Sequence, residues 1–272
     1  MGIGNGQQGA RAAVSLIIPC CNEADGLPAL EAVLPPLIAR LEDRGAVETI
    51  LIDDGSTDET WPMLQGLAAR VPNVHLVRHR TNYGLGAALR TGFSHARGEI
   101  VVTTDADGTY PFAEIPDLVA RLTPETAIVT ASPYHPDGGV DGVPPWRLFL
   151  SKGASRCYRV ALRGRGASVH TYTSLFRAYR REVLPYVMPE HEGFLAVAEI
   201  LVRGTLAGYR VAEYPTVLRA RRYGQSKARV FSITLTHLGF LAGLVTHRVR
   251  VRATAPMLSA PPIATSREVA GG

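Results

Sequence analysis

The sequence predicts an α/β protein with a mostly parallel central sheet flanked by helices. Three observations support this fold class. Short apolar runs that predict buried strands alternate along the chain with amphipathic patterns that predict helices. Hydrophobic residues make up 46% of the 272 residues and charged residues 19%, a composition that can form a full core. Acidic and polar segments follow several of the apolar runs, where open parallel sheets bind their ligands.

Five apolar runs in the first half of the chain predict strands, at 14–19, 49–52, 74–77, 99–104 and 126–130. Helices are expected between them. Leucine and isoleucine recur at three- and four-residue spacing over 27–41, and shorter helical patterns cover 59–69 and 84–96. Strands that alternate with helices in this way pair in parallel, with right-handed crossovers.

The second half of the chain does not continue the regular alternation of strand and helix patterns. Residues 133–145 are rich in Gly, Pro and Asp and predict a long loop. Helices are expected over 146–162 and 192–206, and a strand over 209–217. No run of 18 apolar residues predicts a transmembrane helix, and the nearest segment, 230–245, is interrupted by polar residues. That segment is expected to be either a core helix or an amphipathic helix at a membrane interface.

These patterns divide the chain into four parts. We expect a flexible tail over 1–13, one globular domain over 14–230, a C-terminal helix over 231–252 and a disordered tail over 253–272. Membrane association of the C-terminal helix is one of two alternatives. The three cysteines form no disulfide framework and no CxxC metal pair, which is typical of a reducing compartment. The N-terminus lacks the apolar core of a signal peptide. We therefore expect a cytoplasmic protein, with or without peripheral contact at the inner face of the membrane.

The formal net charge of +5 indicates an anionic partner. Aromatic residues account for only 7% of the chain, and no stripe of Lys and Arg is interleaved with them. Phosphorylated ligands or a membrane surface are therefore favoured over nucleic acid.

Acidic residues gather where the predicted strands end. Asp105 and Asp107 follow the strand at 99–104, and two carboxylates there are costly to bury unless something pairs with them. A divalent cation that carries phosphates is a suitable partner, although the motif alone also fits a turn rich in Asp and Gly. Glu23, Asp53 and Asp54 follow other predicted strands. We expect these acids to share one rim, facing the basic cluster that surrounds Gly224 in the second half.

Several motifs occur in an order and at a spacing that resemble family 2 glycosyltransferases of the GT-A fold. In the first half these are Ile18-Pro19-Cys20-Cys21-Asn22-Glu23, Asp53-Asp54-Gly55-Ser56-Thr57-Asp58, Gly84-Leu85-Gly86 and Asp105-Ala106-Asp107. Those of the second half resemble the dolichyl- or polyprenyl-phosphate mannosyltransferase branch: Phe176-Arg177-Ala178-Tyr179-Arg180, Glu199-Ile200-Leu201, Glu213-Tyr214-Pro215 and Arg221-Arg222-Tyr223-Gly224-Gln225-Ser226-Lys227. The resemblance implies a GT-A-type nucleotide-binding domain with acceptor-side helices towards the C-terminus.

The resemblance also implies site residues. It places Pro19, Glu23 and Asp54 around the nucleotide base and ribose, with Asp53 as the alternative to its neighbour. It places Asp105, Ala106 and Asp107 at the diphosphate, the two aspartates holding Mg²⁺ or Mn²⁺. It makes Arg221, Ser226 and Lys227 phosphate-binding groups and puts Glu199 on the acceptor side. The expected catalytic residues are Asp107, Glu199, Arg221 and Lys227. The chain differs from the usual family pattern at four positions, Cys21, Thr109, Pro133 and Thr171.

The expected function is inverting transfer of a hexose, mannose from GDP-mannose, to a polyprenyl or dolichyl phosphate. Two alternatives keep the nucleotide-sugar site: transfer to a soluble sugar or metabolite hydroxyl, and sugar-nucleotide binding without activity. A dinucleotide-dependent dehydrogenase is disfavoured, because no G-x-G-x-x-G follows the first strand. Plainer roles are open for single residues. Asp54 or Asp58 would suit a helix start, Glu199 a pair with a nearby arginine, and the basic cluster a solvated loop.

Overall fold

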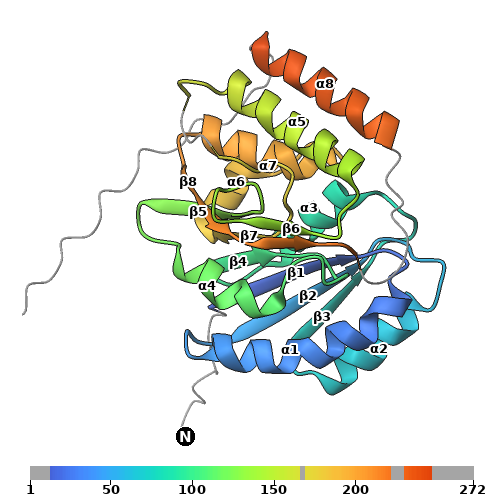
Figure 1. Cartoon of the computed structure of the whole chain (residues 1–272). Coiled ribbons are helices and arrows are strands. Elements are labelled where there is room, and N and C mark those ends of the chain that lie inside the picture. Colours follow the sequence, from blue (N-terminus) through green and yellow to red (C-terminus); the bar gives the residue numbers. More distant parts are fainter. Residues whose placement is uncertain (1–12, 166–168, 222–229, 247–272) are drawn as a thin grey trace, which may run out of the picture.

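The computed structural model of the chain describes residues 13–165, 169–221 and 230–246 (Figure 1). A seven-stranded sheet forms its centre, in the order β3-β2-β1-β4-β7-β5-β8. β7 runs antiparallel to β4 and β5, whereas the other pairings are parallel. The predicted α/β class with a mostly parallel sheet is therefore confirmed. The strands are β1 Val14–Cys20, β2 Val47–Asp53, β3 Val74–Arg78, β4 Ile100–Thr103, β5 Thr126–Ser132, β7 Arg177–Arg180 and β8 Arg210–Pro215.

Helices cover both faces of this sheet (Figure 1). One face packs against α1 Leu27–Glu42, α2 Thr60–Arg70 and α4 Ile115–Ala120. On the other side lie α3 Leu85–His95, α5 Pro145–Ala161, α6 Leu184–Val187 and α7 Leu195–Leu206, and α8 Val230–Val245 packs outside α5 and α7. Three short 3₁₀ turns, at Ala24–Gly26, Phe112–Glu114 and Arg181–Val183, precede α1, α4 and α6.

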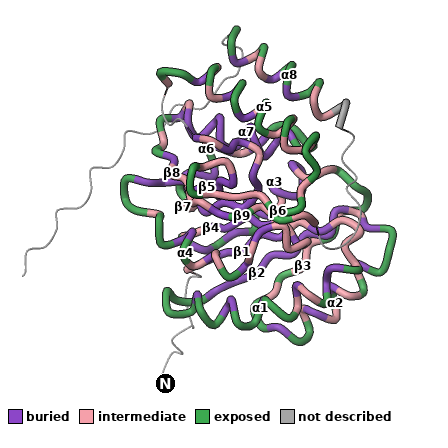
Figure 2. The backbone as a smooth tube through the Cα atoms, viewed as in Figure 1, coloured by how far each residue is buried: buried purple, intermediate pink, exposed green. Residues whose placement is uncertain are grey.

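Alternation along β1 explains why its sequence is apolar at almost every position. Its one polar side chain, Ser15, is buried and donates a hydrogen bond to Glu48. Leu16 and Ile18 point to the face that α1 covers, and Ile17 points to the face that α3 covers. Side chains on successive residues of a strand point to opposite faces, so a strand covered on both sides has no solvent-facing positions. Figure 2 shows the resulting buried centre of the sheet.

Two sequence predictions need correction in the second half. The segment 133–145 is not a loop throughout, because β6 Gly139–Asp141 pairs in parallel with β9 Val217–Arg219. The single strand predicted over 209–217 is instead two strands, β8 and β9, separated at Thr216. This small β6–β9 ladder matters for function, because the chain leaves β9 directly towards the acidic rim.

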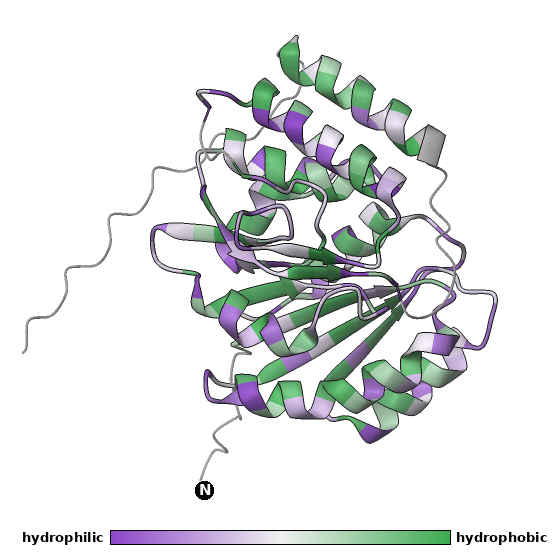
Figure 3. Ribbon diagram, in the orientation of Figure 1, coloured by the Kyte–Doolittle hydropathy of each residue, from purple (hydrophilic) through white to green (hydrophobic). Residues whose placement is uncertain are grey.

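α8 is the outermost helix and packs on α5 and α7. Its inner side buries Phe240 and Leu244, and the ring of His237 shares a 2.7 Å hydrogen bond with the Tyr158 hydroxyl. Its outer side leaves Leu235 and Leu238 more than half exposed. Figure 3 shows that α8 is mostly apolar along its length. None of the helices in the described ranges has the length and apolar character needed to cross a bilayer.

Candidate active site

The carboxyl ends of β1, β2 and β4 meet at one edge of the sheet, and the acids predicted as ligands follow them. β1 pairs in parallel with both β2 and β4, so their ends lie side by side. Glu23 comes three residues after β1, Asp53 ends β2, and Asp105 comes two residues after β4. Pro19, near the end of β1, is in register with Ile52. Parallel sheets of this kind bind ligands at the carboxyl ends of their strands, which we call the carboxyl edge of the sheet.

Asp107 has two differently used carboxylate oxygens. Its Oδ1 accepts hydrogen bonds from the backbone N–H of Thr109, at 2.9 Å, and from the Thr109 hydroxyl, at 2.5 Å. Its Oδ2 lies 3.3 Å from Nε of Arg221. Thr109 is one of the four departures from the family pattern. Its two hydrogen bonds orient Asp107 so that the other carboxylate oxygen faces the Arg221 guanidinium.

Asp105 lies in an environment that disfavours its charged form. Burial, followed by the negative charge of Asp107, raises the pKa of Asp105 to about 8, and the Arg221 guanidinium opposes this shift only in part. Ala106, between the two aspartates, is buried. A carboxyl pair of this kind holds a proton at neutral pH unless more positive charge is supplied.

Arg221 is brought to the acids by β9. The Arg219 N–H donates to the Thr109 carbonyl at 3.1 Å, which fastens β9 to the turn that follows Asp107. Two residues later the Arg221 guanidinium donates from Nη2 to Oε1 of Glu23 while its Nε faces Asp107. The predicted site residues Glu23 and Asp107, from distant parts of the chain, thus both contact the guanidinium of Arg221, which was also predicted for the site. Ser226 and Lys227, also predicted there, lie outside the described residues.

Asp54 lies in a separate network on the same edge. Its Oδ1 is 2.7 Å from Nδ1 of His79 and accepts from the Tyr83 N–H, and its Oδ2 accepts from the Gly84 N–H. The other His79 ring nitrogen lies 2.9 Å from the Thr91 hydroxyl. The carboxylate therefore fixes the segment that leads into α3.

Asp53 is fully buried and supports the turn after β2. Its Oδ1 accepts from the Ser56 N–H at 3.1 Å, and its Oδ2 lies 3.1 Å from Nε of Arg78. Gly55 adopts a φ of +65°, and a Cβ there would overlap the backbone at Thr81. Neither Arg78 nor His79 was among the residues predicted for this site. Their signal was position, because they follow the third predicted strand at the same edge as the acids.

Glu199, predicted on the acceptor side, lies fully buried on α7. Its Oε1 accepts from the Glu190 N–H and from Arg203 Nε, and its Oε2 accepts from the His191 N–H and lies 2.9 Å from His191 Nδ1. Burial alone would raise the pKa of Glu199, but these backbone and side-chain donors outweigh it and hold the pKa below its ordinary value. Both oxygens are thus engaged in holding the loop before α7.

That loop, residues 189–193, packs on the start of α3. The Gly86 N–H donates to the Glu192 carbonyl at 2.5 Å, and Arg90 Nη1 donates to the carbonyls of 189–191. A Cβ at Gly84 or Gly86 would overlap this loop, so the two glycines permit the close approach. The Asp54 network and the Glu199 network therefore join through one stretch of backbone.

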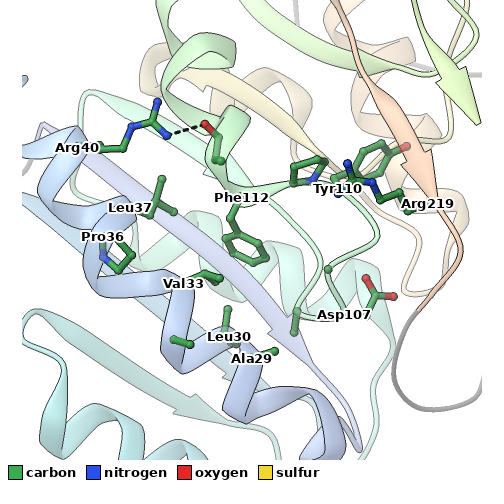
Figure 4. A pocket seen from close by; sticks show the side chains of 15 residues that line it. Ala29, Leu30, Val33, Pro36, Leu37, Arg40, Asp107, Tyr110, Phe112 and Arg219 are labelled. Carbon is green, nitrogen blue, oxygen red and sulfur yellow. Dashed lines mark hydrogen bonds between the residues drawn. The ribbon is translucent and has the colours of Figure 1, made fainter. Parts of the chain in front are cut away.

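A groove of about 370 Å³ runs from α1 to Asp107 (Figure 4). α1 contributes Val33 and Leu37, and Phe112 forms the opposite wall. The Arg40 guanidinium donates to the Ala113 carbonyl at 2.9 Å and closes one end. Arg219 lies at the other end, near Asp107. The groove is mostly apolar and leads directly to the acidic turn.

Asp105 and Asp107 fit a divalent cation. Carboxylate oxygens are the ligands that Mg²⁺ prefers, and sites of this type use one or two carboxylates together with substrate phosphates. Within the described ranges no group of three or more His, Cys, Asp or Glu side chains is arranged to hold a metal.

Comparison with protein families gives a match to the model described as "Glycosyl transferase family 2", over residues 15–187. Among curated relatives, the "Dolichol-phosphate mannosyltransferase" of Pyrococcus furiosus is 33% identical over 216 residues, which are 79% of this chain and 59% of that protein. The "Polyprenol monophosphomannose synthase" of Mycolicibacterium smegmatis is 32% identical over 78% of this chain and 79% of that protein. An "Undecaprenyl-phosphate 4-deoxy-4-formamido-L-arabinose transferase" of Klebsiella pneumoniae is 32% identical over 79% of this chain and 62% of that protein. The chain thus spans about three fifths of the Pyrococcus and Klebsiella relatives.

Solved structures share the fold at lower identity. Glucosyl-3-phosphoglycerate synthase of Mycobacterium tuberculosis, in complex with Mn²⁺, UDP-glucose and phosphoglyceric acid, superposes with a TM-score of 0.63 at 20% identity. The alignment covers 87% of this chain and 80% of that chain. At this identity the comparison shows a common GT-A-like architecture.

Proposed function

The chain belongs to glycosyl transferase family 2, and we propose that it transfers a hexose, with inversion, from a nucleotide diphosphate sugar to the phosphate of a polyprenyl lipid. The observation that carries the proposal is the meeting of Arg221 with Glu23 and Asp107, beside Asp105, at the carboxyl edge of the sheet. A diphosphate needs cationic groups of this kind, and a sugar nucleotide also needs the hydrogen-bond acceptors that the edge provides. The names of the relatives support the lipid-phosphate acceptor.

The acceptor phosphate is already anionic, so it attacks the anomeric carbon without a strong general base. The bond to the donor diphosphate breaks as the new bond forms on the opposite face of the sugar. Arg221 neutralises the charge that grows on the leaving diphosphate. Ser226 and Lys227, which lie outside the described residues, are proposed as its partners in this role. Pro19, Asp53 and Asp54 are proposed to border the base and ribose.

We propose Mg²⁺ or Mn²⁺ as the cofactor, with Asp105 and Asp107 as its protein ligands. When bound, the cation supplies Lewis-acid stabilisation of the diphosphate and orients it. Two features of the site support this assignment: the raised pKa of Asp105, which calls for more positive charge, and the Oδ2 of Asp107, which already faces a cationic group.

For the donor we propose GDP-mannose. The relatives from Pyrococcus and Mycolicibacterium carry mannose in their names, whereas the Klebsiella relative carries a formamido-arabinose. Because the relatives differ in the sugar that their names carry, the assay must include more than one donor.

The test is a transfer assay with purified protein. Radiolabelled GDP-mannose, UDP-glucose and a UDP-linked amino sugar are each incubated with Mg²⁺ or Mn²⁺ and with one acceptor. The acceptors are undecaprenyl phosphate, dolichyl phosphate and a set of soluble sugars. We expect labelled lipid from GDP-mannose, and loss of the product when EDTA is added. Transfer to soluble sugars alone would replace the lipid acceptor by a hydroxyl acceptor. Nucleotide binding without any transfer would leave a binding protein.

We also propose that the outer layer of α5 and α8 rests on the cytoplasmic face of an anionic membrane. Trp146 and Phe149 on α5 are more than half exposed, as are Leu235 and Leu238 on α8. α5 also carries exposed Lys152 and Arg156, which suit lipid phosphates. In this proposal residues 14–230 form the catalytic domain, and α8 belongs to its membrane-facing part. Of the helix predicted over 231–252, residues 247–252 lie outside the described residues.

Vesicle binding tests the membrane contact. We expect the full chain to co-sediment with vesicles that contain anionic phospholipid, and the double variant Leu235→Ser, Leu238→Ser to bind roughly tenfold more weakly, because it loses apolar surface that enters the interface. Val33→Ser is the matched control, since Val33 is an exposed apolar residue on α1, on the opposite face of the sheet. Equal binding by both variants and the wild type would contradict the proposed contact surface.

A further inference from the structure

Tyr83 is a large aromatic residue that the hydrophobic core does not use. It lies between β3 and α3, it is 48% exposed, and it is absent from both clusters of buried residues that the described ranges form. A single exposed aromatic ring is common on protein surfaces and by itself indicates no function. Tyr83 differs from such a residue because it is held in place at the carboxyl edge of the sheet.

Three hydrogen bonds hold the backbone around Tyr83. Its own N–H donates to Oδ1 of Asp54 at 2.9 Å, and the N–H of Gly84 donates to Oδ2 at 2.8 Å. On the other side of Tyr83, Nδ2 of Asn82 donates to Sγ of Cys21 at 3.0 Å, in the loop after β1. Tyr83 therefore lies close to the ends of β1 and β2, although it follows β3 in the chain.

The ring of Tyr83 is held as well. It meets the imidazole of His79 edge to face, with the ring centroids 5.3 Å apart and the planes at 61°. His79 is itself fixed by Asp54 and by the Thr91 hydroxyl on α3. An edge-to-face contact covers at most one face of either ring, so His79 leaves at least one face of Tyr83 uncovered. That face is a flat apolar surface in a defined position.

The strand order places this ring at one end of the candidate site. Asp107 follows β4, whereas Tyr83 follows β3 and bonds to the residue after β2. In the order β3-β2-β1-β4 these positions are two to three strand spacings apart, which is about 10 to 14 Å. An extended nucleoside diphosphate is long enough to bridge this gap, with its diphosphate near Asp107 and Arg221 and its base near the ends of β2 and β3.

We propose that Tyr83 binds the base of the donor nucleotide by stacking. The proposal rests on the proposed function, because it assumes a nucleotide ligand. Every base has a face that can stack on an aromatic ring, and a purine offers a larger face than a pyrimidine. A ring that is already held in place also loses little conformational freedom when the base arrives. In this arrangement Arg221 contacts the diphosphate and Tyr83 contacts the base.

Calorimetry with ligands that differ in the base tests this assignment. GDP, UDP and inorganic pyrophosphate, each with Mg²⁺, are titrated into wild type, Tyr83→Ala and Tyr83→Phe. We expect Tyr83→Ala to weaken GDP binding about tenfold, to weaken UDP binding less, and to leave pyrophosphate binding within about twofold of the wild type. Tyr83→Phe is expected to bind all three ligands as the wild type does, because stacking needs the ring and not its hydroxyl.

Difference absorption in the band of the guanine base gives a second readout. Stacking lowers the absorbance of a base, so we expect GDP at saturating concentration to lose absorbance on binding to the wild type and to Tyr83→Phe. The loss is expected to disappear in Tyr83→Ala. This signal is measured on fully bound protein, and it therefore reports the contact itself and not the affinity.

Tyr186→Ala is the matched control. Tyr186, on α6, also makes an edge-to-face pair, with Tyr209 at 5.7 Å between the ring centroids. Tyr209 directly precedes β8, which runs parallel to β5, so this pair lies towards the edge of the sheet opposite the carboxyl edge. We expect Tyr186→Ala to bind GDP as the wild type does, which would separate the position of Tyr83 from the mere loss of a tyrosine pair.

Equal weakening of GDP, UDP and pyrophosphate binding by Tyr83→Ala would overturn the proposal, because the ring would then support the fold and not a base. Unchanged GDP binding by Tyr83→Ala, or a loss that Tyr83→Phe shares, would also contradict it. A wild type that binds neither GDP nor UDP would contradict the proposed function, whereas GDP binding that does not depend on Tyr83 would contradict only this assignment. Thermal melts of every variant show whether each one is folded.

Discussion

Replacing Asp107 with asparagine is expected to lower the rate of sugar transfer by about 100-fold or more, the loss seen when one group that stabilises developing charge is removed. The amide oxygen of asparagine keeps the bond to the Thr109 N–H, so the turn is retained. What disappears is the negative charge of the carboxylate, whose Oδ2 faces the Arg221 guanidinium. The measurement is the initial rate of lipid-product formation at saturating donor, together with Mn²⁺ affinity.

Asp58→Asn serves as the control for this variant. Asp58 accepts from the Thr60 N–H at 3.0 Å at the start of α2, and asparagine serves equally well there. We expect its transfer rate and Mn²⁺ affinity to match the wild type. If Asp107→Asn kept both properties within about twofold, the reaction centre would have to be sought elsewhere on the sheet edge.

Replacing Glu199 with glutamine is expected to cost roughly 3 kcal/mol of unfolding free energy at pH 7, as for other buried ion pairs that lose one partner. Four donors converge on the carboxylate, and an amide has only one acceptor oxygen to offer them. Its NH₂ group would face the donors of the loop or of Arg203. Urea unfolding followed by circular dichroism measures the change.

The effect of Glu199→Gln should depend on pH with a defined sign. The folded-state pKa of Glu199 lies below its ordinary value of 4.5. The charged carboxylate therefore stabilises the fold fully above about pH 4.5, and this contribution is lost as pH falls through the folded-state pKa. We expect the stability gap between wild type and variant to narrow from pH 7 towards pH 3.

The exposed pair Arg180–Glu182 supplies the control, Glu182→Gln, which should leave unfolding nearly unchanged at both pH values. A Glu199→Gln variant with full stability but no transfer activity would contradict the positioning role inferred from the geometry. It would favour the catalytic role that the resemblance implies for Glu199, which stays a prediction.

The sheet was predictable because most of its strands are apolar on both sides. β7 was not, and Arg177 explains why. This arginine is fully buried in the middle of the sheet, where its guanidinium donates to the Thr130 hydroxyl and to the carbonyls of Tyr172 and Val197. In sequence, Arg177-Ala178-Tyr179-Arg180 is half charged. Nothing in the pattern shows that neighbouring carbonyls will satisfy the first arginine.

The sequence predicted which acidic residues lie at the candidate site better than it predicted which side chains they contact. The rule that ligands bind at the carboxyl ends of parallel strands placed Glu23 and Asp105 on one edge, and both lie there. The arginine offered as a partner for Glu199 is present, as Arg203. The histidine partners were not predicted, because His79 is marked only by its position after a predicted strand and nothing in the sequence marks His191. Which carboxylate meets Arg221 depends on β9, and that strand was not separated from β8 in the sequence.

The single antiparallel strand has a consequence for synthesis of the chain. β4 ends at Thr103, but its neighbour β7 begins only at Arg177. A ribosome that adds about 5–20 residues per second needs roughly ten seconds to make the intervening chain and expose it. During that interval the hydrogen-bonding groups along one side of β4 have no strand to pair with, and open edges of this kind attract other chains. The nascent protein therefore passes through a stage at which it depends on dilution or on chaperones, and that stage ends when the segment bearing Arg177 closes the sheet.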